Sequence, residues 1–88
     1  MHDMFLINKI SDEVIQLCKI NRLNKVTKLV VTVNHRSHVN EENLTKQLLH
    51  LSRQIFGPWT IVQVLRDDIQ DQIAILQTIE GEKISEGI

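Results

Sequence analysis

The run of residues 26–33 is the feature that most restricts what this chain can fold into. Its sequence is VTKLVVTV, in which six of eight residues are β-branched. Side chains of this kind favour a strand over a helix. Alternation along a strand places Leu29, Val31 and Val33 on one face and Lys28, Val30 and Thr32 on the other. We therefore predict a strand whose sheet is covered on one face and largely solvated on the other.

An amphipathic helix is predicted on each side of this strand. Residues 3–21 and 41–56 carry apolar residues at intervals of three and four, the spacing that places them on one helical face. Asn40 is a suitable N-cap with acidic residues directly after it. Gly57, in a left-handed conformation, and Pro58 should end the second helix. The first stripe contains Leu6, Ile7, Ile10, Val14, Leu17 and Cys18, and the second contains Leu44, Leu48, Leu49, Leu51, Ile55 and Phe56.

Two further β-rich runs, residues 59–65 and 72–79, follow the second helix. The short polar connector between them favours an antiparallel hairpin. Ile73, Ile75 and Ile79 should share one face of the last strand. The connector acids Asp67, Asp68 and Asp71 lack calcium-loop spacing and are read as turn residues. Residues 80–88 are expected to fray.

The turns around the first strand are marked by asparagines. Residues 21–24 form a polar break, and Asn34 should end the strand in a left-handed conformation. The predicted fold class is α+β, in the order helix, strand, helix, strand, strand, with both helices packed on one face of a three-stranded sheet. Eighty-eight residues suffice for a single domain over residues 1–88.

Charge and cysteine content exclude several classes of function. Ten basic against eleven acidic residues give a formal net charge of −1, without long runs of either sign. Capture of nucleic acid or of an anionic membrane is not indicated. Cys18, the single cysteine, excludes an internal disulfide or a thiolate zinc cluster and is read as a core residue. No signal peptide or catalytic constellation stands out, so we expect a cytoplasmic protein that is not an enzyme.

The first three residues, Met1, His2 and Asp3, form a candidate metal site. His2 is too large for efficient removal of the initiator methionine, so the α-amine of Met1 should lie one residue from the imidazole. Amine, amide and imidazole nitrogens in one plane suit Ni(II) or Cu(II) better than Zn(II). The alternative is that the chain begins Met-His by chance and that these residues are disordered.

Two more histidines, His35 and His38, follow the first strand. Their spacing beside a turn allows them to supply metal ligands, although exposed loop histidines are often only solvated polar residues. His50 lies off the stripe of the second helix and is read as a surface residue.

Three segments together resemble the HypA-type hydrogenase nickel-incorporation proteins. They are Met1-His2-Asp3 at the start of a helix, residues 25–33 (KVTKLVVTV), and Arg36-Ser37 before a second helix. The resemblance covers nearly all of the chain. It implies a small α/β nickel-binding domain in which the N-terminal amine and the histidine at position two bind nickel. We expect His35 or His38 to complete the site if their loop folds back toward the N-terminus.

Two departures from the family pattern qualify that resemblance. The family carries a zinc module with pairs of Cys-x-x-Cys between the last two strands, where this chain has only the acidic connector, so zinc is not expected. Asp3 stands where the family has glutamate, and Asn34 and His35 also depart from the usual residues.

The resemblance implies a metallochaperone that hands nickel to a maturation GTPase or to the precursor of a nickel enzyme such as a hydrogenase or urease. The main alternative is a zinc-less relative that acts as an interaction or regulatory module without metal transfer. A small enzyme or ligand-binding domain unrelated to nickel is a third reading. A monomer or a homodimer is compatible with the sequence, since an edge strand can pair between subunits.

Overall fold

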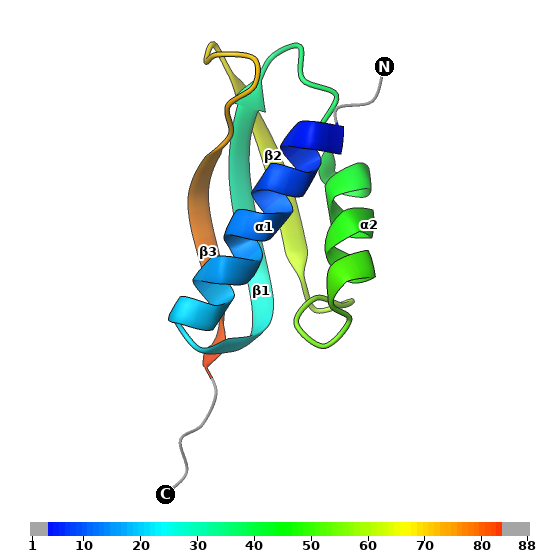
Figure 1. Cartoon of the computed structure of the whole chain (residues 1–88), viewed down its shortest axis with the longest axis vertical. Helices are drawn as coiled ribbons and strands as arrows, with labels where there is room; N and C mark the ends of the chain where they lie inside the picture. Colours follow the sequence, from blue (N-terminus) through cyan, green and yellow to red (C-terminus); the bar gives the residue numbers. More distant parts are fainter. Residues whose placement is uncertain (1–3, 84–88) are drawn as a thin grey trace, which may run out of the picture.

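The computed structural model describes residues 4–83, which form two helices and three strands (Figure 1). They are α1 (Met4–Ile20), β1 (Leu23–Asn34), α2 (Glu41–Leu51), β2 (Ile61–Asp67) and β3 (Ile75–Lys83). The predicted α+β class and element order are confirmed. The predicted ligands Met1, His2 and Asp3 lie outside the described residues. Within residues 4–83, no helix is both long and apolar enough to cross a membrane.

The sheet has the order β2-β1-β3, with β1 in the middle. β1 pairs parallel with β2 and antiparallel with β3. The predicted hairpin between the last two strands is therefore wrong. β1 has apolar residues on both of its faces and gains most from a central position. The connector after β2 crosses the end of β1, where the Asn34 side-chain amide donates to the Ile69 carbonyl.

Both helices cover the same face of the sheet, as predicted. One cluster of buried side chains joins α1, α2 and β1 and includes Phe56 from the segment after α2. Cys18 is 1% exposed within it, which confirms its assignment to the core. The buried cluster consists of Leu6, Ile7, Ile10, Val14, Cys18, Val26, Leu29, Val31, Val33, Val39, Leu44, Leu48 and Phe56.

The opposite face carries no helix, but it is less solvated than predicted. Val30 and Thr32 are only 7% and 5% exposed, and each is paired with a residue of β2 on one side and of β3 on the other. Thr32 also accepts a hydrogen bond from the Gln77 side chain, at 3.1 Å. The exposed apolar residues of this face lie on the edge strands, at Ile61 (64%), Leu65 (40%) and Ile75 (42%).

A register shift in β3 overturns the prediction that its isoleucines share one face. Ile75 pairs with Thr32 on the open face, whereas Ile79 pairs with Leu29 on the core face. The extra residue between these pairs changes the alternation, as a β-bulge does. β3 also continues to Lys83, so the predicted fraying is wrong for residues 80–83.

Two predicted chain reversals, at the end of α2 and at the end of β1, form in another way. α2 ends at Leu51 and is capped by Ser52 in an extended conformation, five residues before the predicted end at Phe56. Neither Gly57 nor Asn34 has a positive φ; in the described chain only Arg22 does, at 56°. Asn34 instead turns the chain through its side chain, which accepts the Arg36 N–H at 2.8 Å.

Candidate functional site

A surface cavity of about 400 Å³ lies between the first turn of α1 and the start of α2. Figure 1 shows these two helix ends next to each other. The cavity is lined by Met4, Ile7, His38, Asn40, Glu42, Asn43 and Lys46. It therefore brings together the segment that follows Asp3 and one of the two loop histidines.

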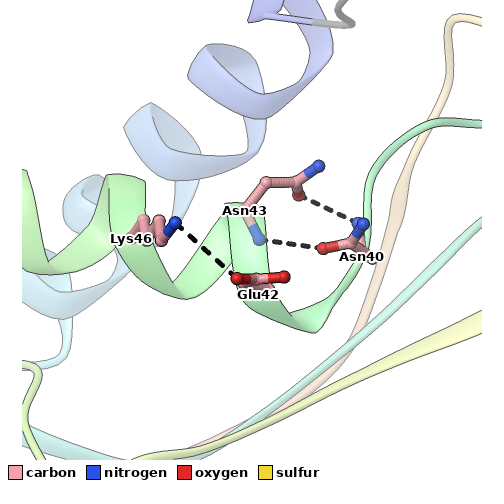
Figure 2. Close-up of polar contacts among 4 residues, drawn as sticks. All are labelled: Asn40, Glu42, Asn43 and Lys46. Carbon is pink, nitrogen blue, oxygen red and sulfur yellow. Dashed lines mark hydrogen bonds and ion pairs between the residues drawn. The ribbon is translucent and has the colours of Figure 1, made fainter.

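A capping box fixes the wall of this cavity (Figure 2). The Asn40 side chain accepts the Asn43 backbone N–H at 2.8 Å, and the Asn43 side chain accepts the Asn40 N–H at 2.9 Å. The amide nitrogen of the Asn43 side chain also donates to the His38 carbonyl at 2.7 Å. The cap thus holds the backbone of His38 against the first turn of α2.

The charges of the cavity lie on α2. Glu42 and Lys46 form an ion pair at 3.6 Å on successive turns, in a highly exposed position (Figure 2). Such a pair contributes only a few tenths of a kcal/mol, about 0.3–0.5. The two helix N-termini present the positive ends of their dipoles to the cavity, which favours anionic groups there. A metal cation would therefore need anionic ligands of its own.

The structure separates the two loop histidines that were predicted as ligands. His38 lines the cavity, whereas His35 lies exposed in the turn after β1 and is not among the lining residues. His50, in the last turn of α2, is exposed as predicted.

The described side chains alone do not assemble a metal site. Within residues 4–83, no three His, Cys, Asp or Glu side chains gather closely enough to hold an ion. Burial raises the pKa of the Cys18 thiol, which keeps it protonated at neutral pH and unsuited as a thiolate ligand. His38 is the histidine among the described residues that line the cavity.

The sequence did not lead us to predict that the Asn43 side chain accepts the Asn40 N–H, or that Lys46 lines the cavity. The signal for the cap was present, since Asn40 and Asn43 have the spacing at which the two side chains can cap each other. The contact between α1 and α2 depends on tertiary packing and has no local signal.

Comparison with known protein families, with curated proteins and with solved structures found no match to this chain.

Proposed function

We propose that this protein is a nickel-binding accessory protein of the cytoplasm, one that holds Ni(II) for transfer and catalyses no reaction. Its proposed partner is a maturation GTPase or the precursor of a nickel enzyme such as a hydrogenase or urease. The observation that carries the proposal is the position of His38. His38 lines the same cavity as Met4, and Met4 directly follows the predicted ligands Met1, His2 and Asp3 in the sequence.

The proposed ligand set matches the electrostatics of the cavity. The Met1 amine and the amide and imidazole of His2 give a planar set of nitrogens, which requires Met1 to be the first residue of the mature protein. A deprotonated amide and the Asp3 carboxylate are anionic, so the positive helix ends stabilise them. His38, which lines the cavity from the loop before α2, is proposed as a further ligand. Binding displaces protons and weakens as the pH falls below the imidazole pKa.

A nickel titration by calorimetry and visible absorption tests this proposal. The native chain with an authentic Met1 terminus should bind one nickel ion per protomer. His2→Ala and a form with an N-terminal extension should both lose this binding, because each removes a nitrogen ligand. His38→Ala should weaken binding about 10-fold or more.

The matched control is His50→Ala, which removes an exposed imidazole from the same helix that borders the cavity. We expect it to bind nickel like the native chain. Equal binding by the native, His2→Ala and extended forms would contradict the proposal.

The alternative function, an interaction module without metal transfer, is favoured by a different observation. Ile61, Leu65 and Ile75 expose apolar surface on the face of the sheet that carries no helix. Such a patch often marks a protein-binding surface. Binding to a purified maturation GTPase separates the two functions. An interaction module should lose this binding with Leu65→Asp and keep it with His2→Ala, whereas a chaperone whose binding depends on nickel should lose it with His2→Ala.

A further inference from the structure

The outer edge of β2 is occupied by a side chain from α2. The Val64 backbone N–H donates to Glu41 Oε2 at 2.9 Å. Glu41 is the first residue of α2, so its side chain extends from the helix to the exposed edge of the sheet. That N–H, and after it the N–H of Glu41 itself, hold the pKa of this carboxyl below its usual range. Glu41 is therefore an ionised acceptor at neutral pH.

The direction of the Val64 N–H fixes which backbone groups of β2 face outward. Backbone groups alternate in direction along a strand, so Val62 and Val64 present theirs to the outer edge and Gln63 presents its own to β1. Gln63 lies opposite Val30 of β1. An added strand would therefore bond to Val62 and Val64.

The sequence of β2 is self-complementary about Gln63. Residues 61–65 read Ile-Val-Gln-Val-Leu, with apolar residues at equal distances on both sides of the glutamine and no charge. In an antiparallel pair of two such strands, Ile61 of one copy lies opposite Leu65 of the other. Both residues are exposed in the single chain, at 64% and 40%. Such pairing would cover apolar side chains of both copies at once.

The backbone pattern fits the same register. Gln63 would face Gln63 of the second copy in a pair without backbone hydrogen bonds, in which Cα atoms are about 4.5 Å apart. The Val62 and Val64 positions on either side would exchange N–H···O=C bonds. The Val64 N–H needed for this exchange is the one that Glu41 occupies.

We propose that the edge of β2 is a strand-pairing surface for a second copy of this chain, and that the Glu41 carboxylate holds it closed. The contact between Glu41 and Val64 does not depend on the proposed metal site. The cavity of that site is lined by residues of α1, of α2 and of the loop before α2, and by no residue of β2. Removal of the carboxylate should convert the chain into a dimer joined through β2.

Cross-linking at the two-fold position tests the proposal. Gln63→Cys is introduced into Glu41→Ala and, as the matched control, into Glu42→Ala, which removes the neighbouring carboxylate that pairs with Lys46. The native Cys18 is buried and does not compete. Under mild oxidation, we expect at least 10-fold more disulfide dimer from Glu41→Ala/Gln63→Cys than from Glu42→Ala/Gln63→Cys. Alanine is a good helix former, so α2 should persist in both variants.

Sedimentation velocity of the same variants without the introduced cysteine provides an independent measurement. Glu41→Ala should sediment as a dimer at concentrations at which the native chain and Glu42→Ala are monomers. Ile61→Lys, added to Glu41→Ala, should restore the monomer, because a lysine on an edge strand opposes pairing. Equal dimer yields from the two cysteine variants, or a Glu41→Ala protein that remains monomeric, would overturn the proposal.

Discussion

The two edge strands of this sheet are held in different ways. β2 follows α2, pairs parallel with β1 and keeps an unbroken register from Lys28↔Ile61 to Asn34↔Asp67. β3 follows a crossing loop, pairs antiparallel and shows register shifts at three places. The position of β2 depends on α2 and on side chains that bind β2 to that helix, such as Glu41. The position of β3 depends on close contact between its backbone and the backbone of β1.

The same difference governs how each edge is protected from other chains. Bulges bend and twist a strand, which makes its edge a poor template for pairing. β3 has one such bulge, at Gln77, and two further register shifts place an extra residue of β1 against it, so its pairing is irregular along its length. β2 is regular and lacks this protection, and its outer N–H at Val64 is instead bound by Glu41. A regular edge thus needs a side chain to close it, whereas an irregular edge is protected by its shape.

The largest effect is expected from Gly81→Ala in β3. A Cβ at this position would clash with the Lys25 carbonyl of β1, a backbone atom that cannot move aside as the end of a side chain can. We expect a loss of about 3 kcal/mol in the free energy of unfolding. Urea denaturation measures it, with the exposed neighbour Glu82→Ala as the control. A Gly81→Ala protein as stable as the control would show that β3 is not held by close backbone contact.

A smaller loss is expected from Arg66→Ala in β2. The guanidinium donates to the Ser37 carbonyl at 2.8 Å and to the Val39 carbonyl at 2.6 Å, and so fixes the loop that leads into α2. Hydrogen bonds from a charged donor that is partly exposed suggest a loss of about 1–2 kcal/mol. Arg53→Ala, which removes an exposed arginine after α2, is the control in the same denaturation experiment. Equal stability of the two variants would contradict this role.

Asn40→Ala should cost about 1 kcal/mol, the usual effect of losing an N-cap. The substitution removes the acceptor of the Asn43 N–H and frees the first turn of α2, which carries Glu41. We expect faster amide hydrogen exchange at Asn43 and at Val64. If only Asn43 exchanges faster, the cap does not position Glu41.

The smallest effect is the pH dependence of Glu41. Its pKa is lowered in the folded chain, mainly by the Val64 N–H. The carboxylate therefore stabilises the fold above its unfolded pKa of about 4.3, and this contribution is lost as the pH falls through the folded pKa. Glu41→Gln should be less stable than the native chain at pH 7 and equal to it near pH 2. A stability difference that does not change with pH would contradict the assignment.

The elements with strong local patterns were predictable from the sequence. Residues 26–33 lie in β1 as expected, and Asn40 caps α2 because its side chain and the acids after it favour a helix start. Both apolar stripes identify the face that the helices bury, although Leu51, predicted on the second stripe, is exposed.

Pairing and fine register were not predictable, because they depend on tertiary contacts. The short connector before β3 favours a hairpin locally, yet the burial of both faces of β1 makes the central position more favourable. The need for glycine at position 81 arises only from the approach of Lys25. His38 was predicted from the sequence as a candidate ligand. Its position in the same cavity as Met4 depends on tertiary packing and was not predictable.

The most direct test of the proposed nickel site is a titration followed by amide NMR of the isotopically labelled chain with an authentic Met1 terminus. Nickel at the proposed site should shift or broaden the signals of residues 4–7 and 38–43, and should leave those of His50 and of residues 61–65 unchanged. That result would place the metal at the cavity between α1 and α2. Changes centred on His50, or no change at one equivalent of nickel, would contradict the account.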